Sequence, residues 1–407
     1  MKITAALAAA LGLAACDRFL VDDISTTPKP RKDIVLTKAQ SDILPATREF
    51  TFDFMREVCA SGNDNVFLSP FSLQTALSMA SAGADGQTRE EINRAIGLED
   101  FSTEDVCSLY ETLVPALLDA DRTVKVAIAN SVWARPEISM KTDYESLLKH
   151  SFSASVHELG SGSAKEISKW VGKATDGMIK DMKVPLDDAM MVLINALYFK
   201  GIWSDVFDKA DNVEDDFTNY DGSKTRVSYM AKTKKMPYYY GDVASAINLP
   251  YGNGAYRMTI VIPTEADGSI DEVLDLLDEQ TWDKMTHPEQ SGTVRLKMPK
   301  FECEYELSLV PVLKKLGIDR AFKNTAEFPF MSDTPLKIND VVQKALVKVD
   351  ERGTEAAAVT HVVVGATDAG PDMDEFRFDV NAPFFYAISE VSTGTILFTG
   401  VHKYMSR

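Results

Sequence analysis

A segment near the C-terminal end of the chain, residues 351–364, combines features of a sheet strand and of a loop. In an extended strand, successive side chains alternate between the two faces. One face of this segment would then carry only uncharged side chains of small or moderate size: Thr354, Ala356, Ala358, Thr360, Val362 and Val364. A run of Gly, Ala, Asp and Pro residues follows at 365–372, which is typical of an exposed loop. The segment is therefore predicted to exist either outside a sheet or within one.

The residues of this segment resemble the reactive-loop hinge of the inhibitory serpins. The match consists of Glu351, Gly353, Thr354, Glu355, Ala356, Ala357 and Ala358. Two later motifs, at 378–384 and 393–400, are similar to the C-terminal signature and the closing hairpin of the same family. The resemblance extends over about residues 44–401. It implies the α+β serpin fold, with a large, mostly antiparallel central sheet, surrounding helices, smaller sheets and an exposed reactive loop at about 351–377.

The resemblance implies a suicide-substrate inhibitor of serine endopeptidases, with cysteine proteases as a second class of target. Counting forward from Glu351 in the family pattern places the scissile bond between Thr367 and Asp368. Cleavage after one of three neighbours stays open as an alternative: Val364, Ala366 and Ala369. Each of these candidate residues is small or β-branched, so an elastase-like or broad-specificity protease is expected.

The inward face of the hinge has no charged side chain. A charge there would oppose insertion into a dry core, so its absence favours an inhibitor. The alternative reading is a non-inhibitory serpin-fold lipoprotein with a binding or structural role.

Two serines resemble the serpin shutter, the region beneath the opening of the central sheet. These are Ser69 and Ser72. Ser69 is also predicted to cap a helix that has Pro70 at its first position.

Residues 192–203 form a nearly continuous apolar run, which is typical of a strand buried on both faces. By the resemblance, Asn195 belongs to the shutter and Trp203 to the breach at the top of the sheet. Gln343 stands where many serpins have a His. Its amide is expected to hydrogen-bond across the shutter, but it cannot titrate.

The N-terminus predicts export and attachment to a membrane surface. Residues 1–15 read as a signal peptide that is too short to span a membrane. The sequence ending in Cys16 resembles a bacterial lipobox, which implies a lipidated, palmitate-bearing Cys16 on the cell envelope, at the outer membrane, the cell surface or the periplasm. Residues 16–42 are predicted to be a tether and 43–407 the serpin domain. The first helix is expected over 43–60, with Pro45 in its first turn.

The net charge of the chain excludes some classes of binding partner. The formal net charge of −18 disfavours nucleic acid, and the only basic residue in 101–122 is Arg122, so no heparin-type polyanion is expected. The chain is expected to be a monomer.

Apart from Cys16 the cysteines are odd in number and lack CxxC spacing, which argues against a disulfide framework. Cys59, Cys107 and Cys303 are expected to be buried apolar residues.

No constellation for catalysis stands out. The five histidines include no pair at metal-ligand spacing, and the chain has no HExxH, GxSxG or Walker-type motif. The sequence therefore predicts a protein that is not an enzyme and needs no cofactor or metal.

Overall fold

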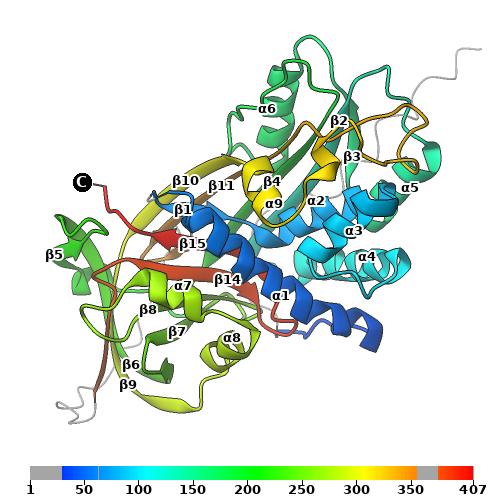
Figure 1. Ribbon diagram of the computed structural model, residues 1–407. Coiled ribbons are helices and arrows are strands. Elements are labelled where there is room, and N and C mark those ends of the chain that lie inside the picture. Colours follow the sequence, from blue (N-terminus) through cyan, green and yellow to red (C-terminus); the bar gives the residue numbers. More distant parts are fainter. Residues whose placement is uncertain (1–29, 63, 355–374, 407) are drawn as a thin grey trace, which may run out of the picture.

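The computed structural model describes residues 30–62, 64–354 and 375–406, and its strands form two sheets (Figure 1). The central sheet has six strands in the order β10-β11-β12-β4-β2-β3. Their bounds are β2 Val124–Ala134, β3 Ser155–Glu158, β4 Met191–Ile202, β10 Phe301–Ser308, β11 Asp340–Asp350 and β12 Gly353–Thr354. Among the described residues of this sheet, only the β4–β11 and β2–β3 pairs are parallel. The sheet is thus mostly antiparallel, as predicted.

The second sheet has nine strands in the order β1-β15-β14-β8-β7-β6-β9-β13, with β5 paired to β6. Their bounds are β1 Val66–Leu68, β5 Val213–Thr218, β6 Lys224–Tyr240, β7 Ala244–Tyr251, β8 Tyr256–Pro263, β9 Gln290–Pro299, β13 Phe376–Asp379, β14 Phe384–Glu390 and β15 Ile396–His402. β14 and β15 form the antiparallel C-terminal hairpin that the sequence predicts.

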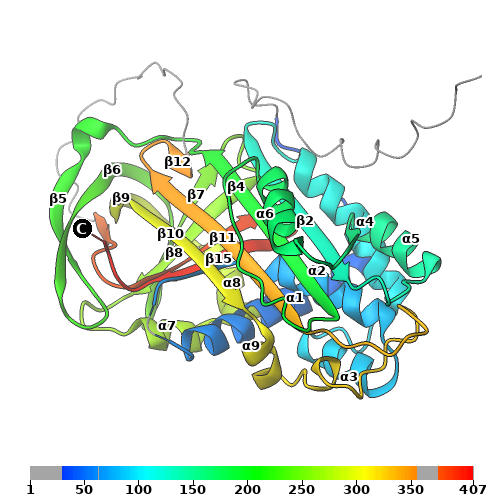
Figure 2. The same cartoon turned by 90° about the horizontal axis from the view of Figure 1, so that it is seen from above.

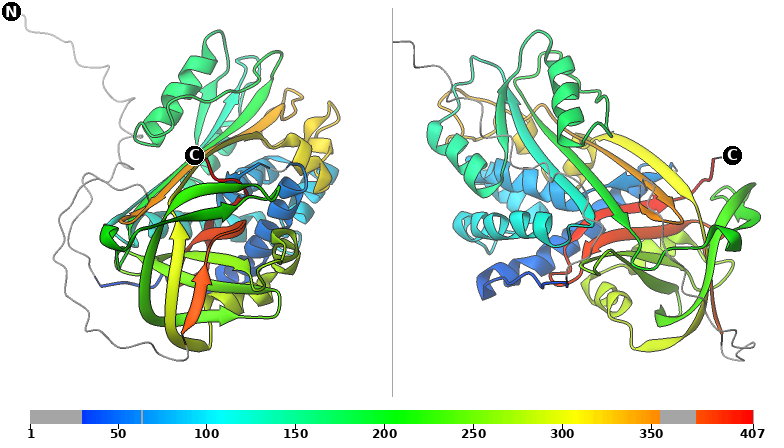
Figure 3. Two further views of the ribbon diagram at one scale, coloured as in Figure 1. Left: turned by 90° about the vertical axis from the view of Figure 1, so that its left-hand side faces the viewer. Right: turned by 180° about the vertical axis from the view of Figure 1, so that it is seen from behind.

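Helices lie on both sides of the central sheet (Figures 2 and 3). Helix α2 contacts β4 of the central sheet and β15 of the second sheet, whereas α6 packs on β2 and β4. The helices are α1 Lys38–Cys59, α2 Pro70–Gly83, α3 Gly86–Ala95, α4 Thr103–Asp119, α5 Thr142–Ser151, α6 Ser163–Ala174, α7 Ile270–Leu276, α8 Glu279–Thr286 and α9 Val310–Lys315, with 3₁₀ turns at Lys209–Asp211 and Arg320–Phe322.

Strand β4 is buried on both faces, as its apolar run predicts. Leu193, Leu197 and Phe199 belong to the main core, whereas Val192 and Ile194 belong to a separate core under α6. Alternate residues of a strand face opposite sides, so a strand between two cores has to be apolar throughout.

Helix α2 starts where the sequence predicts. The Ser69 hydroxyl accepts a hydrogen bond from the Ser72 N–H at 3.3 Å, and Pro70 occupies the first helical position. Every residue of α2 is buried, which fits its place between the two sheets.

The first helix starts earlier than predicted. Helix α1 begins at Lys38, so Pro45 lies inside the helix and the predicted boundary at 43 cuts through it. A capping box explains the earlier start, because the Thr37 and Gln40 side chains each accept a hydrogen bond from the other's backbone N–H. Buried Gln40 also donates to the carbonyl of Ser108 at 2.9 Å. The last part of the predicted tether is therefore part of the folded domain.

Candidate functional site

Two residues of the predicted hinge form a strand inside the central sheet. This strand, β12, lies between the upper ends of β4 and β11 (Figure 2). Gly353 pairs with Asp350 of β11 and with Ile202 of β4, and Thr354 continues both antiparallel registers. The hinge has thus entered the sheet by its first residues.

Glycine is required at position 353. Gly353 has φ 151°, a region that L side chains rarely adopt. A Cβ atom there would lie 2.0 Å from the carbonyl oxygen of Gly201. Any larger residue would therefore push the hinge backbone away from β4.

The Thr354 side chain contacts Tyr251, whose ring stacks on Trp203. Its side chain is buried, and its hydroxyl lies 2.6 Å from that of Tyr251. The Trp203 ring stacks on Tyr251 with 4.3 Å between ring centroids. The indole Nε1 of Trp203 donates to the carbonyl of Asp350 at 3.0 Å. Trp203 therefore supports the turn between β11 and β12.

Glu351 fixes the start of the hinge through a buried carboxylate. Its Oε1 accepts from the Asn212 amide at 2.6 Å and pairs with Lys300 Nζ at 3.2 Å. Its backbone carbonyl accepts from the N–H of Phe207 at 2.8 Å. Burial raises the pKa of Glu351, but these hydrogen bonds and the Lys300 charge outweigh it and hold the pKa below 4.5. The side chain is therefore ionised at neutral pH.

Below the hinge, β4 and β11 pair directly. Their parallel pairing runs from Val192 and Asp340 to Ala196 and Lys344. In the described chain the pairing ends there, so residues 197–200 and 345–348 are not partners of one another. The junction between β4 and β11 is closed at its lower end and divided by β12 at its upper end.

A buried polar cluster closes the lower end. It consists of Ser69, Ser72, Asn130, Asn195 and Gln343, all at most 3% exposed. The Gln343 amide accepts from the N–H of Ser69 at 2.7 Å and donates to Asn195 Oδ1 at 2.8 Å. The Asn195 amide donates in turn to Ser72 and Asn130. Gln343 thus makes the hydrogen bonds across the opening that its amide was expected to make, and the cluster ties α2, β2, β4 and β11 together.

Sequence reasoning missed several members of this site. Asn130 is a polar residue within the largely apolar strand β2, directly opposite Asn195, and that interruption was an available signal. Tyr251, Asn212 and Lys300 lie on distant strands or loops, and no local pattern indicates that they contact the hinge.

Other predicted positions lie outside the described residues. They are the signal peptide 1–15, Cys16, most of the tether, the later hinge residues Glu355, Ala356, Ala357 and Ala358, and the candidate cleavage positions Val364, Ala366, Thr367, Asp368 and Ala369.

The cysteines of the described chain are unpaired and buried, as predicted. Burial raises the pKa of Cys59 to about 11 and that of Cys303 to about 12. Neither thiol is therefore ionised at neutral pH. Over the described ranges no three His, Cys, Asp or Glu side chains gather in a metal-binding arrangement. No helix among the described residues is both long and apolar enough to cross a membrane.

Comparisons with known proteins agree with this geometry. The sequence pattern of the serpins, serine protease inhibitors, matches residues 45–404. An uncharacterized serpin-like protein of Thermococcus kodakarensis is 31% identical over 385 residues, which cover 93% of this chain and 89% of that protein.

Solved structures share the fold. The thermophilic serpin tengpin in its native state superposes with a TM-score of 0.83 at 28% identity, over 93% of this chain and 97% of tengpin. Human thyroxine-binding globulin in complex with thyroxine gives a TM-score of 0.81 at 23% identity, over 89% and 98%, a likeness that shows the fold alone. Together with the hinge strand and the polar cluster, these matches establish that the chain belongs to the serpin family of protease inhibitors.

Proposed function

We propose that this chain inhibits a serine endopeptidase of elastase-like or broad specificity as a suicide substrate, with cysteine proteases as a second target class. The observation that carries the proposal is β12, which already occupies the first two positions of a new strand between β4 and β11. A strand that continues from Thr354 would be antiparallel to both neighbours, as β12 is.

The two registers of β12 agree along the whole junction. If both are continued, residue 355 falls beside Lys348 and Lys200, and residue 363 falls beside Asp340 and Val192. Asp340 and Val192 are already partners in the closed lower half. A strand inserted down to residue 363 therefore fits β4 and β11 without a slip in either.

The same registers match side chains to their surroundings. Directly opposite residues of a sheet share a face. Ala356 would lie between Val347 and Phe199, both of the main core. Thr360, the one polar residue of the inward face beyond Thr354, would lie between Gln343 and Asn195 of the polar cluster. The small apolar residues thus meet the core and the threonine meets amides.

Insertion of the cleaved segment into the central sheet supplies the free energy that drives inhibition. Each ladder hydrogen bond contributes about 1 kcal/mol net, so filling the junction gains on the order of 10 kcal/mol before apolar burial is counted. That gain is comparable with the whole stability of a typical domain, about 5–15 kcal/mol. The uncut form is then a kinetically trapped state.

The chemistry begins with attack of the protease serine Oγ on the carbonyl carbon of residue 367. The serine proton passes through the protease base to the departing amine of Asp368 as the peptide bond breaks, and an ester joins the two proteins. Insertion then carries the ester-linked protease away and distorts its active site before water hydrolyses the ester. This chain supplies only the acyl group, so it needs no catalytic residue of its own.

A panel of proteases tests the proposal. Elastase-like enzymes are expected to form a complex that survives boiling in detergent, and intact mass should place the cut after Thr367. Cleaved protein should melt higher by roughly 10–30 °C. A non-inhibitory serpin-fold protein would instead be cleaved without a covalent complex and without a rise in melting temperature.

Lipid anchoring at the bacterial cell envelope is part of the same proposal. It is supported by the sequence around Cys16. Labelled palmitate should enter the wild-type chain and not Cys16→Ser, and the variant should move from the membrane fraction to the soluble exported fraction. Equal labelling of both proteins would contradict the anchor.

A further inference from the structure

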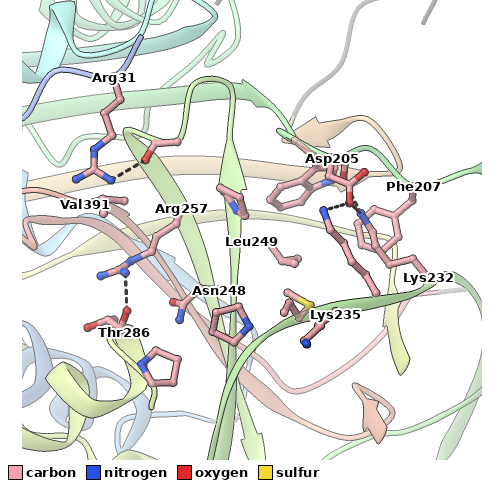
Figure 4. Close-up of a pocket in the computed structure, with 17 residues that line it drawn as sticks. Arg31, Asp205, Phe207, Lys232, Lys235, Asn248, Leu249, Arg257, Thr286 and Val391 are labelled. Atoms are coloured by element: carbon pink, nitrogen blue, oxygen red, sulfur yellow. Dashed lines mark hydrogen bonds and ion pairs between the residues drawn. The ribbon is translucent and has the colours of Figure 1, made fainter. Parts of the chain in front are cut away.

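A cavity of about 450 Å³ lies beside the second sheet (Figure 4), and two of its lining residues, Trp203 and Phe207, also contact the upper end of the β4–β11 junction. Its walls come from β6, β7 and β8, the segment 203–207, the end of α8 and Arg31 of the N-terminal segment. The volume falls within the range of ligand pockets, about 300–1,000 Å³.

One end of the cavity holds an ion-paired carboxylate. Asp205 pairs with Lys234 at 2.8 Å and with Lys232 at 3.6 Å. The Lys232 ammonium also lies 3.9 Å from the centre of the Phe207 ring. Lys232 and Lys234 therefore already have partners, and Lys235 is a further cation in the lining.

The opposite end holds a buried arginine. Arg257 is 7% exposed, and its guanidinium donates to the carbonyl of Thr286 at 2.7 Å and to the Ser389 hydroxyl at 3.4 Å. Among the described residues no carboxylate forms an ion pair with it. Buried arginines are usually paired, because an unpaired charge in a low-dielectric site is costly.

The nearby carboxylates do not neutralise the charge of Arg257. The carboxylate of Glu390 is taken up by hydrogen bonds from Ser392 and Thr393. Burial and then the charge of Arg31 lower the pKa of Arg257 to about 10, while Glu390 and Asp283 oppose the shift. Arg257 is still protonated at neutral pH. Arg31 lies on the same side of the cavity (Figure 4), where it is ion-paired with Asp33 at 2.8 Å and donates to the carbonyl of Gly254 at 3.4 Å.

Between the two ends the wall is largely apolar. The apolar lining residues include Leu249, Pro250, Met236, Pro237 and Trp203, and Asn248 is a polar one among them. An occupant that meets these groups has one anionic end and an apolar body.

We propose that this cavity is a binding site for a monocarboxylate with an apolar chain, such as a medium-chain fatty acid. The carboxylate accepts hydrogen bonds from Arg257, and the chain lies along Leu249 and Met236 toward Trp203. Hydrogen bonds between a guanidinium and a carboxylate are charge-assisted, and they are stronger than neutral ones. The site does not depend on protease inhibition.

Calorimetric titration with decanoate and with decan-1-ol tests the proposal, because the two ligands share a chain length and differ in charge. Decanoate is expected to bind the full-length protein saturably, at least about tenfold more tightly than the alcohol. Equal affinity for both ligands, or no binding of decanoate below its micellar concentration, would overturn it.

Variants locate the carboxylate. Arg257→Gln should weaken decanoate by about tenfold or more and leave decan-1-ol unchanged. Arg31→Gln, at a partly exposed position, should weaken decanoate about threefold and answers the question if Arg257→Gln does not fold. Arg226→Gln, an exposed arginine on β6 outside the cavity, is the matched control and should bind decanoate as the wild type does. Unchanged decanoate affinity in the Arg31 and Arg257 variants would refute the site.

Discussion

The two ends of the β4–β11 junction are closed by different means. At the lower end, β4 and β11 pair directly, and buried amides and hydroxyls add side-chain hydrogen bonds between these strands and the start of α2. At the upper end, the strands are separated and a two-residue strand fills the space with backbone hydrogen bonds. A strand that inserts from the upper end would first pass between strands that are already separated. It would reach the hydrogen-bonded polar cluster only afterwards. In the proposed mechanism this difference would make insertion proceed from the upper end to the lower end, and each end can be altered separately.

The largest effect is expected from a charge at the upper end. Thr354→Arg places a guanidinium in the buried site against Tyr251, where an unpaired charge costs about 3–5 kcal/mol. Insertion should stall, so the variant is cleaved by the protease with no detectable covalent complex on detergent gels. Thr354→Ser keeps the hydroxyl and should retain inhibition; a complex yield for Thr354→Arg equal to that of Thr354→Ser would contradict the insertion path.

The next effect concerns the lower end. Gln343→Ala removes the bridge between Ser69 and Asn195 and leaves buried polar groups unpaired. The free energy of unfolding of the intact protein should fall by about 2–4 kcal/mol, measured in urea. Lys348→Ala on the exposed side of the same strand is the control, with an expected change below about 0.5 kcal/mol.

A smaller effect links the two ends. In the register of β12, Thr360 reaches the polar cluster only after insertion. Thr360→Val should therefore leave the melting temperature of the intact protein unchanged and lower the stability of the cleaved form by about 1–2 kcal/mol. Val359→Thr, on the outward face, serves as the comparison. If both forms of Thr360→Val lose stability equally, the register is wrong.

The smallest effect is a pH dependence at Glu351. Its pKa is lower in the folded protein than the ordinary 4.5. The carboxylate therefore adds stability above pH 4.5, and this part is lost as the pH falls through 4.5 to the folded pKa. Between pH 6 and pH 3.5, Glu351→Gln should lose less melting temperature than the wild type. Equal losses would show that the Lys300 pair does not contribute.

Prediction from sequence succeeded where the signal was local or resembled a known pattern. The apolar run of β4 and the Ser69–Pro70 helix start follow from periodicity and capping, and both appear in the structure as predicted. The start of α1 was missed although Thr37 and Gln40 form a capping box, because the polar composition of that region favoured a tether and Pro45 favoured a later start.

The sequence alone determined that a segment with one small, uncharged face follows β11 and that the chain resembles the serpins. Alternation and motif spacing are properties of neighbouring residues, so they can be read without coordinates. The depth to which the hinge enters the sheet, the place of Asn130 opposite Asn195, and the meeting of Arg31 with Arg257 were decided only by tertiary structure. Each depends on register and packing between segments distant in the chain, and residue order does not specify such contacts locally.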